Sequence, residues 1–215
     1  MIIDLHVHEK TNSQDSILSL EEIIQQGEAI GLDGVCITDH ESQDIRFLLA
    51  RYRKTTRMSL FYGAEILTPH GDLLVFGLDD LPSLQGGTSA FIHEVNRRGG
   101  ALVSAHPFRK NNRGFGDAIR KFSGIHRVEG YNGNTPYRYN MEAVSIAVQL
   151  GIPLVGGSDA HSRHRLGVYA TEFLSEIHSE KQLAQALRSG QGWPVMLTAD
   201  GFQHVMDPAV QREAV

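Results

Sequence analysis

Short, nearly continuous apolar runs alternate with amphipathic segments along the chain. An apolar run bounded by turn residues is typical of a parallel strand that is covered on both faces, because side chains on both sides of such a strand are buried. This pattern predicts strands at residues 2–6, 34–38, 60–66, 73–76, 101–105, 127–131 and 153–157.

The amphipathic segments carry helix start and stop signals. Ser19 and Glu22 have the spacing of a capping box, in which the two side chains satisfy free backbone amides at a helix start. Gly31 then provides a stop, because glycine readily adopts the left-handed conformation that ends helices. Similar signals predict helices over 140–151 and 179–190, and weaker patterns predict helices over 43–54, 90–97 and 116–122.

Alternating strands and helices indicate βαβ units and a parallel sheet. The chain has 215 residues, which suits a single domain spanning 1–215 with a sizeable core. An eight-fold (β/α) barrel typically needs about 250 residues. We therefore predict an α/β barrel of about seven units, similar to a TIM barrel, with a doubly wound open sheet as the alternative.

Composition narrows the class of protein. The net charge of −5 argues against a stable nucleic-acid complex, since phosphate backbones are bound by clustered Lys and Arg. No apolar run approaches the roughly 18 residues that a membrane helix needs. Asp4 and Glu9 stand where a signal peptide would be basic and then apolar, so we expect a cytoplasmic protein. Cys36, the single cysteine, lies in an apolar run and is predicted to be a packed core residue.

The eleven histidines are the unusual feature, because several follow predicted strands. His6 and His8 stand two residues apart at the end of the first strand, so their rings face the same way. Parallel strands of a barrel end at the face where active sites are built. We therefore expect one cluster from the side chains that follow successive strands, which are His6, His8, His40, Glu65, His106, Asp159 and His161.

Clustered ionisable groups need neutralising partners, and metal ions provide them. A mixed set of imidazoles and carboxylates suits zinc, manganese or iron. The ligands outnumber those of one tetrahedral site, so the sequence predicts two or three divalent transition-metal ions with a shared carboxylate. Such a centre is strongly positive and attracts an anionic substrate such as phosphate.

The ordered motifs resemble the PHP family, named for polymerase and histidinol phosphatase domains. The matching segments are His6-x-His8, Asp15-Ser16, Thr38-Asp39-His40, Gly63-x-Glu65, Ala105-His106-Pro107 and Gly157-Ser158-Asp159-Ala160-His161. The resemblance covers nearly the full chain. It implies a distorted (β/α)7 barrel, up to three metal ions, and hydrolysis of phosphomonoesters or phosphodiesters.

The resemblance also implies a division of the ligands. One metal takes His6, His8, Glu65 and Asp159, a second shares Glu65 and takes His106, and a third takes Asp15, His40 and His161. Catalysis is assigned to Glu65, His106 and Asp159. Many relatives have histidine directly after the glycine at Gly71, whereas here the histidine is His70. Neither His70 nor Asp72 is assigned as a ligand.

Residues beside the ligands are expected to hold the substrate. Arg109 follows His106 across a proline that restricts the path of the chain. Arg163, His164 and Arg165 follow the last motif, although a solvated loop is the plain alternative for the two arginines. Asp39 is a candidate for orienting a ligand, and Glu129 and Asn132 match a strand-end pattern of relatives.

The sequence thus predicts a metal-dependent phosphoesterase in which a metal-activated water attacks phosphorus. Its expected substrate is a small-molecule phosphate ester or a short nucleotide, with monoester and diester both open. Two alternatives stay open: a metal-dependent amidohydrolase, and a metal-binding protein without catalytic activity. The position that a carboxylated lysine fills in many amidohydrolases corresponds here to Glu65, which argues against that subtype.

Overall fold

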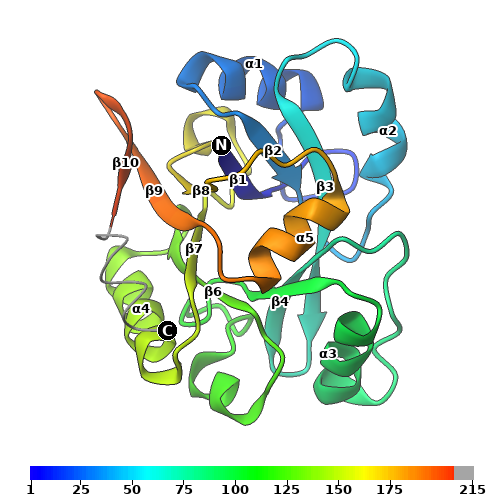
Figure 1. Ribbon diagram of the computed structural model, residues 1–215, viewed down its shortest axis with the longest axis vertical. Coiled ribbons are helices and arrows are strands. Elements are labelled where there is room, and N and C mark those ends of the chain that lie inside the picture. Colours follow the sequence, from blue (N-terminus) through cyan, green and yellow to red (C-terminus); the bar gives the residue numbers. More distant parts are fainter. Residues whose placement is uncertain (206–215) are drawn as a thin grey trace.

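The computed structural model describes residues 1–205 and has a mixed α/β architecture (Figure 1). The strands are β1 (Ile2–Val7), β2 (Gly34–Ile37), β3 (Ser59–Thr68), β4 (Gly71–Phe76), β5 (Ala101–Ser104), β6 (Arg127–Asn132), β7 (Leu154–Gly157), β8 (Tyr169–Glu172), β9 (Trp193–Thr198) and β10 (Gly201–His204). The helices are α1 (Leu20–Ile30), α2 (Ile45–Tyr52), α3 (Gly87–Arg97), α4 (Tyr137–Leu150) and α5 (Glu180–Arg188), with 3-10 helices η1 (Gly116–Lys121) and η2 (Arg163–Arg165).

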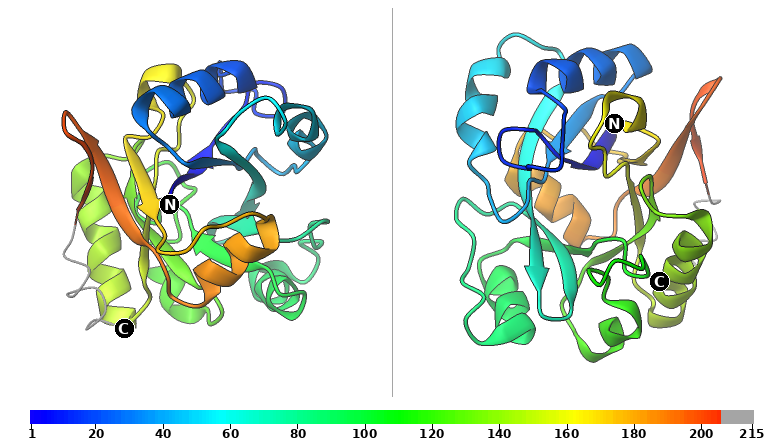
Figure 2. Two further views of the ribbon diagram at one scale, coloured as in Figure 1. Left: turned by 45° about the horizontal axis from the view of Figure 1, so that its top comes forward. Right: turned by 180° about the vertical axis from the view of Figure 1, so that it is seen from behind.

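All these strands belong to one sheet in the order β10-β9-β8-β1-β2-β3-β4-β5-β6-β7. The sheet curls into a half-barrel (Figure 2), and a parallel bridge between Val7 and Ala160 joins the chain after β7 to β1. The backbone N–H of Asp159 donates to the carbonyl of His6 over 2.7 Å. The predicted barrel-like α/β fold is confirmed, and its closure places motifs from both halves of the sequence side by side.

The expectation of a parallel sheet throughout is wrong in two places. β4 runs antiparallel to both β3 and β5. Only Pro69 and His70 separate β3 from β4, and parallel strands need a crossover of a dozen or more residues. The short link therefore forces a hairpin. The antiparallel strands β8, β9 and β10 were not predicted. β8 and β10 have only four residues each and mix polar with apolar positions, whereas the apolar run at the start of β9 was not interpreted as a strand.

Helix boundaries follow the capping signals closely. Ser19 caps α1 with the complete capping box to Glu22, and Gly31 ends it at φ 84°. α4 begins at Tyr137, before the predicted Asn140, because Pro136 has the extended conformation that precedes a helix. The segment 116–122 forms a 3-10 helix where an α-helix was expected.

The core inside the half-barrel is apolar and is covered at one end by α5, which lies in front of the sheet in Figure 1. Cys36 is buried in this cluster, as predicted. Arg127 is also fully buried, and its Nε donates to the carbonyl of Leu187 over 2.7 Å. The guanidinium thus caps the carboxyl end of α5 and fixes that helix under the barrel.

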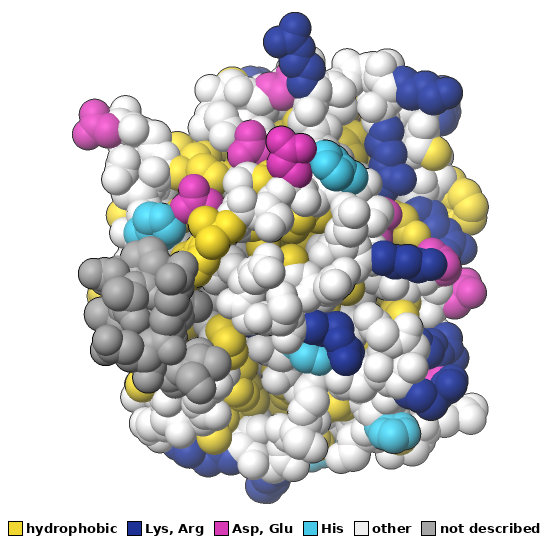
Figure 3. Space-filling model, viewed as in Figure 1, with side chains coloured by type: hydrophobic (Ala, Val, Ile, Leu, Met, Phe, Trp, Pro, Cys, Tyr) yellow, Lys and Arg dark blue, Asp and Glu magenta, His cyan; other side chains and the backbone are white. Residues whose placement is uncertain are grey.

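The surface agrees with the modest net charge. On the face drawn in Figure 3, basic side chains along the edge formed by α2 and α3 are interleaved with acidic ones. Within residues 1–205, the helices are too short or too polar to cross a bilayer.

Candidate metal centre

The eight predicted ligands meet on the face where β1, β2, β5 and β7 end, with Glu65 contributed from within β3. Four groups of three side chains each have donor atoms within 4.8 Å of one another. These groups are His6–His8–Glu65, His6–His106–Asp159, Glu65–Asp72–His106 and His8–His40–His161.

Hydrogen bonds determine which ring nitrogens of His6 and His8 are protonated. His6 Nδ1 lies 2.9 Å from Glu129 Oε1, and an ionised carboxylate only accepts, so Nδ1 carries the proton. Ser13 Oγ donates to Asp39 over 2.8 Å and must therefore accept from His8 Nδ1, at 3.2 Å. In both rings the Nε2 lone pair is left to point into the cluster.

Those two lone pairs face one another across only 3.0 Å. Such an arrangement is repulsive unless a proton or a metal ion lies between or beside the nitrogens. Asp159 Oδ1 lies 3.7 Å from His6 Nε2 and 3.4 Å from His8 Nε2, and Glu65 lies 3.6 Å from each of them. Two imidazole nitrogens and two carboxylates converging on one point form a donor set that fits a divalent transition metal.

The carboxylates of the cluster favour positive charge at His6. Burial by itself lowers the pKa of His6, but Asp159, Glu129 and Glu65 together hold its pKa well above the ordinary value. Burial dominates at His8 and lowers its pKa to about 4. The carboxylates that favour a proton on His6 also favour a metal ion, and only one of these cations fits between the rings.

Glu65 lies between three histidines. Its Oε1 is 2.8 Å from His106 Nε2, and its Oε2 is 2.8 Å from His40 Nδ1. Burial raises the pKa of the Glu65 carboxyl, but His6, His106 and His40 overcome this effect and hold the pKa well below its usual range. A buried ionised carboxylate with one oxygen toward each half of the cluster has the position that a bridging ligand requires.

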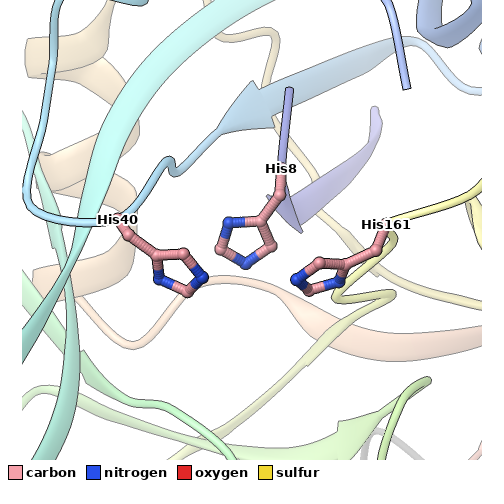
Figure 4. Close-up of side chains that lie close together, drawn as sticks. All are labelled: His8, His40 and His161. Carbon is pink, nitrogen blue, oxygen red and sulfur yellow. The ribbon is translucent and has the colours of Figure 1, made fainter. Parts of the chain in front are cut away.

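A third group lies nearer the surface. The His8 ring sits between those of His40 and His161, with centroids 4.4 Å from each (Figure 4). Asp15 Oδ2 lies 3.1 Å from His40 Nε2 and 3.2 Å from His161 Nε2. The sequence analysis assigned His8 to the first group alone, whereas the structure places its ring within reach of both groups.

Residues behind the ligands fix their orientation. Asp39 accepts a hydrogen bond from Ser13, and Ser13 in turn accepts from the His8 ring. Asp39 thus orients His8 through Ser13, which is the role that the sequence suggested for it. Glu129 accepts from His6, from the backbone N–H of His106 at 2.8 Å, and from Asn132 Nδ2 at 2.9 Å.

Two ligand positions have strained backbones. His106 has φ 29° and Asp159 has φ 52°, in a region that non-glycine residues rarely adopt. Each such residue costs on the order of 1 kcal/mol, and these conformations cluster at functional sites.

Of the predicted substrate-binding residues, some lie at the cluster and others lie away from it. Arg109 reaches the cluster, where its Nη2 donates to Asp159 and, over 2.7 Å, to Asn132 Oδ1. Arg165 donates to the carbonyl of Gly133 near this group. Arg163 instead contacts Gln26 of α1, and His164 is exposed beside Ser162. Arg109 therefore has the best position for holding a substrate.

Two residues of the cluster were not assigned from the sequence. Asp72 is fully buried, and its Oδ2 lies 3.7 Å from His106 Nε2. Arg113 Nε donates to Asp72 over 2.7 Å. The register pairs Glu65 with Leu74, so Asp72, two residues before Leu74, points to the same side as Glu65. That alternation would have identified Asp72, whereas His70 hydrogen bonds to Thr88.

Comparisons with known proteins agree with this architecture. Residues 137–191 match the model of a family described as PHP-associated. An uncharacterised protein of Methanocaldococcus jannaschii is 25% identical over 129 residues, which are 55% of this chain and 75% of that protein.

Two solved structures share the fold. One is a two-domain protein from Bacteroides vulgatus that contains a predicted PHP-like metal-dependent phosphoesterase, with TM-score 0.67 and 20% identity over 90% of this chain and 64% of that chain. The other is an amidohydrolase from Chromobacterium violaceum, solved with bound sulfate and no metal, with TM-score 0.63 and 15% identity over 88% of this chain and 96% of that chain.

At 15–20% identity, these neighbours show that the chain shares their barrel-like fold. The match to the PHP-associated model over residues 137–191 agrees with the resemblance of the motifs to the PHP family.

Proposed function

We propose that this protein is a metal-dependent hydrolase of phosphate esters. The observation that carries the proposal is the pair of lone pairs on His6 and His8, 3.0 Å apart and flanked by Glu65 and Asp159. A divalent ion bound by both nitrogens and the two carboxylates would use all four donors at once. The full set of proposed ligands, for two or three ions of zinc, manganese or iron, is His6, His8, Asp15, His40, Glu65, His106, Asp159 and His161.

Bound divalent ions would supply Lewis-acid stabilisation of a phosphoryl group and an activated water. The protein residues account for the rest of the site. Without cations, the carboxylates of Asp15, Glu65 and Asp159 repel a phosphate. Ions with a charge of +2 reverse that sign, so the same cluster then attracts an anionic ester.

We propose that Arg109 binds the phosphoryl group of the substrate. Its Nε donates to Thr135 Oγ1 over 3.0 Å and its Nη2 to Asn132, so one edge of the guanidinium is fixed. The side chain is 16% exposed, which leaves it accessible beside the ligand Asp159. Nε and Nη2 are used by these protein partners, so Nη1 is the nitrogen that would donate to a phosphoryl oxygen.

We infer that residues 1–215 act as one domain, because the cluster takes side chains from β1 to the loop after β7. The proposed substrate is a small-molecule phosphate ester or a short nucleotide. Amide hydrolysis is the second candidate, and the amidohydrolase fold neighbour favours testing it.

An assay with three substrate classes tests this proposal. We expect the protein loaded with manganese, zinc or iron to hydrolyse a phosphomonoester or a phosphodiester, and chelation to abolish the activity reversibly. Hydrolysis of amides alone would replace the phosphoesterase proposal with the amidohydrolase alternative. Inactivity on all three classes with every metal would favour a non-catalytic metal-binding protein.

A further inference from the structure

Asp72 is a buried carboxylate of the cluster, but it is not among the metal ligands proposed above. We propose that Asp72 is a ligand of the metal ion held by Glu65 and His106, and that Arg113 makes this ion the weakly bound, exchangeable one. The inference rests on the proposed metal centre and assigns a ligand and a property within it.

The backbone places Asp72 in the centre. It lies on β4 opposite Leu67, and antiparallel pairing with β3 brings its side chain to the interior face that carries Glu65. One donor atom from each of Glu65, Asp72 and His106 lies within 4.8 Å of the other two. All three residues are buried.

The two oxygens of Asp72 have different surroundings. Oδ2 accepts from Arg113 Nε over 2.7 Å. Oδ1 is buried and has no hydrogen-bond partner within residues 1–205. A buried carboxylate oxygen without a donor is costly. A metal ion bound beside Glu65 and His106 would satisfy Oδ1 without displacing Arg113 from Oδ2.

Arg113 lowers the affinity of this site for a cation. Its Nε is hydrogen-bonded to Asp72 and its Nη2 lies 3.7 Å from Glu65 Oε2, so its charge adjoins two of the three ligands of this site. In the first group the direct arginine contact is that of Arg109 with Asp159 Oδ2, whereas Oδ1 is the Asp159 oxygen nearest the His6 and His8 rings. The first group also offers four donor residues, His6, His8, Glu65 and Asp159, against three in the Glu65–Asp72–His106 group. Fewer donors and the charge of Arg113 directly on Asp72 therefore make the Glu65–Asp72–His106 ion the first to leave.

The donor set adds a preference among metals. Two carboxylates and one imidazole form a harder set than the two imidazoles and two carboxylates of the first group. Hard oxygen donors favour manganese relative to zinc. We therefore expect the ratio of zinc affinity to manganese affinity to be smaller at the exchangeable site than at the tight site.

Titration of the metal-free, full-length protein with Mn2+ tests the inference, with bound ions counted by calorimetry and by the EPR signal of free Mn2+. Asp72→Asn should bind one equivalent fewer than the wild type and keep the tighter equivalents. Arg113→Gln should lower the Kd of the weakest equivalent by on the order of tenfold. Asp117 and Arg120 form a matched exposed pair 3.8 Å apart, so Asp117→Asn and Arg120→Gln should change neither value.

The outcomes separate this inference from the function on which it rests. A wild type that binds two or more ions, with Asp72→Asn binding the same number at the same affinities, would overturn the role of Asp72 alone. A wild type that binds no Mn2+ or Zn2+ would overturn the metal centre and this inference with it. Should Asp72→Asn fail to fold, the shift in Arg113→Gln decides, and an unchanged weakest Kd would contradict the proposal.

Discussion

Glu65→Gln should reduce metal-dependent phosphoester hydrolysis at least about a hundredfold. The substitution keeps the shape of the side chain and removes the charge between His106 and His40, each 2.8 Å from one carboxylate oxygen. Because Glu65 faces two groups of the cluster, one substitution should weaken two metal sites together. Bound metal should therefore fall by more than one equivalent.

The fold of this variant should survive. Side chains at the carboxyl ends of barrel strands serve the site more than the core, and an amide retains hydrogen bonding to the neighbouring rings. Circular dichroism and thermal unfolding of the metal-free protein check this point. Glu142→Gln, on the exposed face of α4, is the matched control and should retain full activity. Wild-type turnover with full metal content in Glu65→Gln would show that Glu65 is not the bridging ligand.

Arg109→Ala should give the second-largest effect, a loss of about 2–4 kcal/mol in transition-state stabilisation. We expect this loss in kcat/KM for the best available phosphoester, measured at saturating metal, where metal content should equal that of the wild type. The reason is geometric: the guanidinium is fixed by Thr135 and Asn132 beside the ligand Asp159.

Arg109→Lys separates charge from geometry. A lysine restores the positive charge but makes no planar, paired contact, so it should recover only part of the loss. Arg163→Ala is the matched control, because Arg163 contacts Gln26 on α1 and lies outside the cluster. Unchanged kinetics in Arg109→Ala would remove Arg109 from the proposed site and make Arg165 the next arginine to test.

The sequence predicted the features of the fold that depend on local patterns. Continuous apolar runs located β1 to β7, and the capping box at Ser19 and Glu22 located α1 within a residue. β8 escaped prediction because it pairs with the distant strand β1, a contact that no local pattern contains. β9 and β10 form a hairpin across Ala199 and Asp200, which the sequence analysis did not predict. The antiparallel placement of β4 was predictable in principle from the two-residue link before it.

The sequence predicted most of the residues of the site, but not how they are oriented. Strand-end position identified the side chains that meet, since barrel closure brings β7 to β1. Position alone did not reveal that His8 lies between His40 and His161, because that depends on ring orientations set by Ser13 and Asp39. Asp72 was left unassigned because the sequence analysis did not treat residues 71–76 as the antiparallel partner of β3. Arg113 comes from an irregular loop, where no periodicity indicates direction.

The central claim is that this cluster is a multinuclear metal centre. Elemental analysis of protein purified without chelator tests it most directly. We expect two or three equivalents of manganese, iron or zinc per chain, or uptake to that level when the metal is added. Fewer than one equivalent, with no uptake on addition of manganese or zinc, would contradict it.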